Sequence, residues 1–143
     1  MSKTVLITGA TAGIGKACAH KFAQEGYRII ISGRRADRLE VIASELTDQY
    51  NTEVLILEFD VRNKEDVQKA VNSLSEEWST IDVLVNNAGL ALGLSPVQDG
   101  DTEDWDTMID TNIKGLLYMG KAVSNLMIKK SRGHIINIGS IAG

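Results

Sequence analysis

Five short apolar runs rich in β-branched residues recur along the chain, and stretches with helical periodicity separate them. The runs are Thr4–Thr8, Tyr27–Ser32, Glu53–Phe59, Asp82–Asn86 and His134–Ile138. They are continuously apolar, as expected for strands whose two sheet faces are both covered by helices. This alternation constrains the fold more than any other feature, because helical crossovers between consecutive strands produce a parallel sheet. We therefore predict an α/β domain with a doubly wound parallel sheet.

The intervening stretches carry apolar residues at helical spacing. One set is Leu39, Ile42, Ala43 and Leu46, and another is Val67, Ala70, Val71, Leu74 and Trp78. Gly26 suits the end of the first helix and Asn63 the N-cap of the third. A longer helix is expected from Thr102 to about Lys130. The connection from 87 to 101 holds the only proline, and long connections of this kind are usually functional.

Length and composition limit the number of domains and the kinds of partner. A chain of 143 residues is enough for one domain, which we place at residues 1–143. A net charge of −4 argues against nucleic acid or an anionic membrane as a partner, since both bind basic patches. The apolar runs are too short to cross a bilayer, and no secretory signal precedes the first strand, so we expect a cytoplasmic protein. One cysteine and two scattered histidines predict no metal site.

The glycine-rich stretch "ITGATAGIGKA" follows the first strand and opens a helix. In that setting Gly9 allows a tight turn, Gly13 lets backbone N–H groups approach a pyrophosphate, and Gly15 lets the helix pack on the strand. The anion then lies at the helix N-terminus, where unpaired N–H groups attract it. The alternative is a glycine-rich turn without a ligand. We predict a dinucleotide loop and hence a Rossmann-type fold with five strands in the order 3-2-1-4-5.

Two arginines follow the second strand, where many dinucleotide-binding proteins carry an acidic residue for the ribose 2′-hydroxyl. Arg34 and Arg35 would instead pair with a 2′-phosphate. The alternative is a solvated basic turn. Beside the phosphate loop, the arginines favour NADP as the cofactor. After the third strand, Asp60 and Val61 stand where a carboxylate and a backbone N–H could meet an adenine, although a turn Asp ahead of a helix is an equal alternative.

Four stretches together are similar to the short-chain dehydrogenase/reductase family, and the resemblance covers the whole chain. They are the glycine-rich loop, "NNAG" at 86–89, the region of Asn112 and "INIGSIAG" at 136–143. The stretch from 86 to 119 resembles in particular the NADP-dependent 3-hydroxy acid (serine-type) dehydrogenases of that family. The resemblance implies that the loop contacts the pyrophosphate through Thr8, Gly9, Thr11, Ala12, Gly13, Ile14 and Gly15. It also implies that Asp60 and Val61 flank the adenine, that Asn87 and Gly89 lie against the adenosine ribose, and that Asn86 steadies the central strands.

The same resemblance implies two catalytic residues. Asn112 corresponds to an asparagine that supports a proton relay through bound water, and Ser140 to a serine that hydrogen-bonds the reacting oxygen of the substrate. The sequence places Asn112 within an apolar helical stripe, four residues from Met108 and from Leu116, so we expect a buried amide with hydrogen-bond partners. An Asn satisfied by neighbouring backbone is the alternative. Ser140 follows the fifth strand, where open α/β sheets bind ligands, and its alternative is a Ser-capped turn.

The family's general acid/base is a tyrosine in a Tyr-x-x-x-Lys motif on a helix beyond the serine. None of Tyr27, Tyr50 and Tyr118 has a lysine four residues later. We therefore expect the sequence to be the N-terminal part of the family fold, with negligible turnover by itself.

The leading hypothesis is an NADP-dependent oxidoreductase that transfers a hydride between the nicotinamide and a secondary alcohol or carbonyl, with a small 3-hydroxy acid as substrate. The rival is a non-catalytic NADP-binding module. A Tyr-x-x-x-Lys pattern encoded directly downstream would favour the enzyme, and a natural stop codon there would favour the module.

Apolar residues outside the main helical stripe indicate self-association. Ile113, Leu117 and Leu126 add more apolar surface to the long helix than one buried face requires. Members of the family commonly pair through this helix, so we expect a homo-oligomer. A broad intramolecular core face is the alternative.

Overall fold

A computed structural model of the chain, which describes residues 2–141, contains one sheet of five parallel strands in the order β3-β2-β1-β4-β5. The strands are β1 (Thr4–Thr8), β2 (Arg28–Gly33), β3 (Val54–Glu58), β4 (Val83–Asn86) and β5 (His134–Asn137). Each boundary lies within one residue of the predicted one. The predicted Rossmann-type fold and strand order are confirmed.

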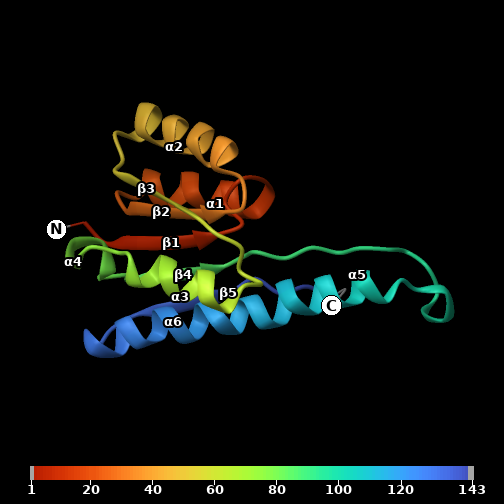
Figure 1. The fold of residues 1–143 in the computed structure, drawn as a ribbon. Helices are drawn as coiled ribbons and strands as arrows, with labels where there is room; N and C mark the ends of the chain where they lie inside the picture. Colours follow the sequence, from red (N-terminus) through yellow and green to blue (C-terminus); the bar gives the residue numbers. More distant parts are fainter. Residues whose placement is uncertain (1, 142–143) are drawn as a thin grey trace.

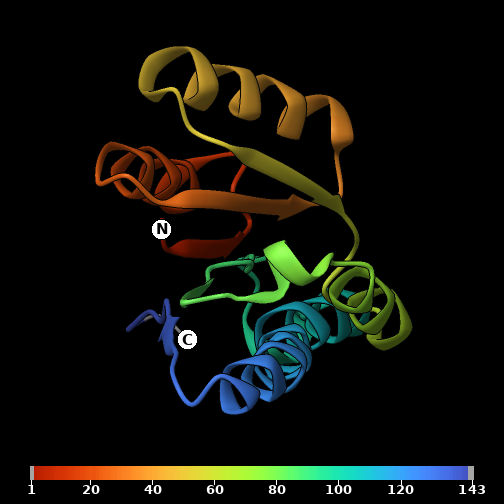
Figure 2. The same cartoon turned by 90° about the vertical axis from the view of Figure 1, so that its left-hand side faces the viewer.

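Helices cover both faces of the sheet, which explains the continuously apolar strands (Figures 1 and 2). On one face lie α1 (Gly13–Gln24) and α2 (Ala36–Tyr50), and on the other lie α3 (Lys64–Asn72), α4 (Glu76–Ser79) and α6 (Leu116–Lys129). Successive residues of one strand enter different cores. Val5 and Ile7 belong to the core under α1 and α2, whereas Leu6 belongs to the core under α3 and α6.

The first and third helices have the predicted end signals. Gly26 adopts a φ of 85°, a left-handed conformation that follows the end of α1. The side chain of Asn63 accepts a hydrogen bond from the N–H of Asp66 at 3.1 Å and so caps α3.

The prediction that one helical stripe runs from Val67 to Trp78 is wrong. Helix α3 ends at Asn72, and the separate short helix α4 starts after Ser75, whose hydroxyl accepts a hydrogen bond from the N–H of Trp78. Ser73 donates a hydrogen bond from its own hydroxyl to the carbonyl of Ala70. These local side-chain bonds compete with helix continuation, since serine favours caps and turns. Trp78 still packs against the core, as predicted.

The long helix contains a π-helical segment, Asp110–Gly115, between α5 (Thr102–Ile109) and α6. The wider turn changes which side chains face the core, because a π-helix bonds five residues apart rather than four. Thr111 and Gly115 are buried there, whereas Asn112 is exposed. The expectation of a buried Asn112 is therefore wrong.

The loop from 87 to 101 and helix α5 form an arm that extends away from the sheet (Figure 1). The ring of Trp105 on α5 lies against Gly100, so the helix and the loop that precedes it contact each other within the arm. Trp105 and Ile109 are exposed because the arm leaves the body of the protein. Within residues 2–141, no helix combines the length and the apolar character needed to cross a membrane.

Candidate functional site

A cleft of 440 Å³ lies at the edge of the sheet that is formed by the carboxyl ends of β1, β2, β3 and β4. This is the edge at which open α/β sheets bind ligands. Four segments that are far apart in sequence line it: the loop after β1, the end of β2, the residues after β3 and the residues after β4. The lining consists of Gly9, Thr11, Ala12, Gly13, Ile14, Ser32, Gly33, Arg34, Arg35, Arg38, Phe59, Asp60, Val61, Arg62, Asn87, Ala88, Gly89, Leu90 and Thr111.

The loop between β1 and α1 needs glycine at two positions for different reasons. Gly9 has a φ of 61°, and a Cβ there would lie 3.0 Å from Nδ2 of Asn87. A Cβ on Gly15 would overlap the carbonyl oxygen of Gly9. The first turn of α1 therefore packs directly on the end of β1. The side chain of Asn87 fixes this arrangement, because its Nδ2 donates to the carbonyls of Thr8 and Gly9 at 3.3 and 3.0 Å.

The N-terminus of α1 is built differently from those of α3, α4 and α5. Its N-cap, Ala12, provides no side-chain hydrogen bond, and its first turn contains no acidic residue. The N-cap side chains of α3, α4 and α5 each accept a backbone hydrogen bond, and each of those first turns is acidic. The unpaired N–H groups and positive end of α1 thus remain available where Gly13 and Ile14 line the cleft. These residues fit an anionic group such as a pyrophosphate.

Four arginines line the part of the cleft beside the ends of β2 and β3. Arg35 pairs with Asp37 at 3.3 Å, and Arg62 pairs with Asp60 at 2.7 Å. In the part of the chain that the structure describes, no carboxylate forms an ion pair with Arg34 or Arg38, and both are exposed. Two guanidinium groups are therefore available to a second anionic group of a ligand.

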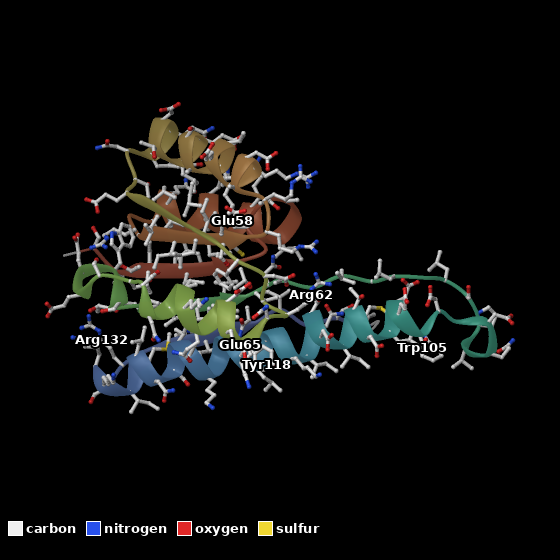
Figure 3. The ribbon with its side chains drawn as sticks, viewed as in Figure 1. Glu58, Arg62, Glu65, Trp105, Tyr118 and Arg132 are labelled. Atoms are coloured by element: carbon white, nitrogen blue, oxygen red, sulfur yellow. The ribbon has the colours of Figure 1, made fainter. Side chains whose placement is uncertain are left out.

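Asp60 and Arg62 form a chelated ion pair inside the cleft lining. Nε and Nη2 of Arg62 donate to the carboxylate of Asp60 at 2.7–3.1 Å, and the backbone N–H of Arg62 donates to it at 2.9 Å. Burial raises the pKa of Asp60, but the hydrogen bonds and charge of Arg62, together with the charge of Arg34, lower that pKa more. The Asp60 carboxyl is thus ionised at neutral pH. Arg62 lies near the point at which the arm leaves the sheet (Figure 3).

The cleft brings together most of the residues predicted to contact a dinucleotide. They are Gly9, Thr11, Ala12, Gly13, Ile14, Arg34, Arg35, Asp60, Val61, Asn87 and Gly89. Thr8 and Gly15 are buried behind this lining. The hydroxyl of Thr8 donates to the carbonyl of Val85 and accepts from the N–H groups of Asn87 and Ala88, so it joins the ends of β1 and β4. Direct contact of these residues with a cofactor stays a prediction.

Neither predicted catalytic residue lines the cleft. The side-chain amide of Asn112 forms two hydrogen bonds with the main chain of Leu90. Its Nδ2 donates to the Leu90 carbonyl at 2.7 Å, and its Oδ1 accepts from the Leu90 N–H at 2.9 Å. Asn112 thereby ties the segment after β4 to the long helix. Ser140 is exposed, three residues beyond the end of β5. Residues 142 and 143, the end of its motif, lie outside the described residues.

Asn86 links β4 to the edge strand β5 and to α6, whereas the resemblance implied a role in steadying the central strands. Its Nδ2 donates to Oδ1 of Asn137 on β5 at 3.1 Å and to the carbonyl of Leu116 on α6 at 3.4 Å. The carboxyl ends of β4 and β5 are therefore held together next to the cleft.

Sequence reasoning missed several lining residues. They are Ser32, Gly33, Arg38, Phe59, Arg62, Ala88, Leu90 and Thr111. Arg38 could have been found, because it follows Arg34 by four residues at the start of a helix and so lies near it. Nothing in the sequence marks Ser32 or Thr111, since the burial of a hydroxyl depends on the packing of distant elements.

A family model described as short chain dehydrogenase matches residues 3–143. The chain is 52% identical over 139 residues to the NADP-dependent 3-hydroxy acid dehydrogenase YdfG of Shigella flexneri. That match covers 97% of this chain but 54% of the relative. The chain thus spans about half the length of the curated relatives it matches.

Solved structures show the same likeness. The closed form of a serine dehydrogenase complexed with NADP+ is 50% identical, with a TM-score of 0.89, over 98% of this chain and 55% of that one. An NAD+-bound xylitol dehydrogenase is 34% identical, with a TM-score of 0.94, over 99% of this chain and 54% of that one. Structures of this fold thus include complexes with either dinucleotide.

Proposed function

The chain belongs to the short chain dehydrogenase family, and from this premise we propose that it binds NADP and serves a dehydrogenase that acts on a small 3-hydroxy acid. The observation that carries the proposal is the cleft itself. It joins an uncapped helix N-terminus to a cluster of arginines, and NADP carries an anionic pyrophosphate and an anionic 2′-phosphate.

Different residues of the cleft would bind these two anionic groups. The loop from Gly9 to Gly13 and the first turn of α1 would hold the pyrophosphate, and Arg34 and Arg38 would pair with the 2′-phosphate. Asp60 and Val61 would flank the adenine. Asn112 contributes indirectly, because its hold on Leu90 fixes the wall that Asn87 and Gly89 provide for the ribose.

The reaction we propose is oxidation of a secondary alcohol or reduction of the corresponding carbonyl. Bound NADP supplies a hydride acceptor, and NADPH a hydride donor, at the nicotinamide. Ser140 would hydrogen-bond the reacting oxygen, and Asn112 would support a proton relay. The names of the similar proteins, a 3-hydroxy acid dehydrogenase and a serine dehydrogenase, support a small 3-hydroxy acid as substrate. Because the proposal makes the protein a user of intracellular NADP(H), we place it in the cytoplasm.

Arg34→Asp is expected to weaken NADPH binding roughly tenfold to a hundredfold while changing NADH binding little, because a charge-assisted phosphate contact is lost. Isothermal titration with each cofactor measures the difference. Lys129→Asp, which makes the same charge change at the exposed end of α6, provides the control and should leave both affinities unchanged. Equal affinities of the unmutated protein for NADPH and NADH would contradict the NADP assignment.

We also propose that the protein forms a homo-oligomer through the long helix. Ile109, Ile113 and Leu117 follow one another at four-residue spacing, and their exposed fractions are 46%, 54% and 59%. Leu126, predicted to add to this surface, instead packs against the core under α3 and α6. The apolar row therefore lies around the π-helical segment and the start of α6.

Leu117→Asp is expected to shift the protein toward a monomer, because a charge would be buried in the proposed interface. Sedimentation velocity over a range of concentrations measures this. Val41→Asp on α2 is a matched control, since Val41 is 56% exposed and lies on the opposite face of the sheet. A monomeric unmutated protein at high concentration would contradict the oligomer.

A further inference from the structure

We propose that the hydroxyl groups of Ser32 and Thr111 bind the adenosine part of the dinucleotide by hydrogen bonds. This inference rests on the proposed function, because it takes NADP as the ligand of the cleft. It adds two residues to the site, one from β2 and one from the π-helical segment.

Both hydroxyls are buried without a hydrogen-bond partner. Ser32 is 1% exposed and Thr111 is 7% exposed, and both line the cleft. Among the described residues, the other buried side-chain atoms without such a partner are Nε and Nη2 of Arg28. The guanidinium of Arg28 lies 3.9 Å above the ring of Trp78 and forms an ion pair with Glu77, which accounts for its burial.

A neighbouring hydroxyl shows the usual arrangement. Thr8 is as buried as Ser32 and lies on the adjacent strand, yet its hydroxyl has three partners within the protein. A buried hydroxyl without a partner costs folding free energy. Two such groups in the lining of one cleft point to a ligand that provides the missing partners.

The positions of the two residues indicate which part of the ligand they meet. Ser32 is paired in register with Leu57, and the N–H of Phe59 bonds the carbonyl of Gly33 at 3.0 Å, so Ser32 lies beside the segment that follows β3. Arg34, which is proposed for the 2′-phosphate, follows Ser32 by two residues.

Thr111 reaches the same segment from the long helix. One turn further along the helix, a Cβ on Gly115 would lie 2.7 Å from Cγ2 of Val61, so the helix passes closely over Val61. The charge of Asp110 also acts on Arg62. Both hydroxyls therefore lie by residues 59–62, where the resemblance places the adenine. An adenosine offers ring nitrogens and ribose oxygens as acceptors and an exocyclic amine as donor, and a hydroxyl pairs with either kind.

Ser32→Ala and Thr111→Val test the proposal because each removes the hydroxyl with little change in shape. We expect each variant to bind NADPH roughly three- to tenfold more weakly, by isothermal titration. Adenosine 2′,5′-bisphosphate, which lacks the nicotinamide, should lose affinity by the same factor. Thr111→Ser keeps a hydroxyl and should retain most of the affinity.

Thermal unfolding without ligand gives an independent readout. Thr111→Val should leave the melting temperature unchanged or raise it, because it removes an unpaired polar group. Thr8→Val should lower it, because it breaks bonds within the protein. A fall for Thr111→Val comparable with that for Thr8→Val would overturn the inference.

Unchanged NADPH affinity in both variants would also overturn the inference, while leaving the proposed function intact. Failure of the unmutated protein to bind NADPH would refute the proposed function, and the inference with it. The outcomes therefore distinguish the two.

Discussion

Gly15→Ala is expected to lower the free energy of unfolding by about 3 kcal/mol or more and to abolish NADPH binding. The new methyl group would overlap the carbonyl oxygen of Gly9, which is backbone and cannot move without shifting the loop. Relief of the overlap requires α1 to separate from the end of β1. The loop from Gly9 to Gly13 would then lose the arrangement proposed to hold the pyrophosphate.

Urea unfolding of the variant, followed by isothermal titration with NADPH, measures both effects. Gly120→Ala is the matched control, since Gly120 is also helical but has open space around its Cβ position. There the added methyl should stabilise the protein by about 0.5–1 kcal/mol through helix propensity. Similar stability changes for the two variants would show that the contact between Gly15 and Gly9 is not tight.

A polypeptide of these 143 residues is expected to bind NADPH but to turn over substrate at least about 10²-fold more slowly than a full-length 3-hydroxy acid dehydrogenase. Positioned acid–base catalysis contributes about 10²–10⁴-fold, and no tyrosine in this sequence has a lysine four residues later. Ser140 does not replace it, because a serine hydroxyl is by itself a weak proton donor and acceptor near neutral pH.

The measurement is NADPH oxidation in the presence of a 3-oxo acid, using protein whose intact mass is verified as 15.5 kDa. A full-length short chain dehydrogenase assayed in parallel shows that the conditions support turnover. Rates within a few fold of that enzyme would contradict the assigned need for the Tyr-x-x-x-Lys pair.

The strands could be predicted to within a residue because burial on both faces leaves a continuous apolar signal. The π-helical segment at Asp110–Gly115 could not, because its residues are compatible with an ordinary helix and its close contact with Val61 joins elements that are distant in the sequence. The apolar pattern of that region therefore predicts the wrong buried positions. Asn112 is the clearest case.

The residues of the candidate site likewise differ in whether the sequence predicts them. The glycine-rich loop could be found because a β-turn-α junction demands particular backbone conformations, and these restrict the residue types. Arg34 could be found from its place after a strand. Ser32 and Thr111 could not, since a lone hydroxyl has no local pattern and its missing partner is apparent only once distant elements are packed around it.

The bonds between Asn112 and Leu90 engage only the main chain of the loop. The side chain at position 90 is therefore not what the helix recognises, whereas the amide at 112 has no close substitute: aspartate lacks the donor, and glutamine is one methylene longer. Related sequences should accordingly vary at position 90 more readily than at 112. For protein engineering, this anchor predicts that side chains of the arm beyond Leu90 can be changed while Asn87 and Gly89 keep their positions.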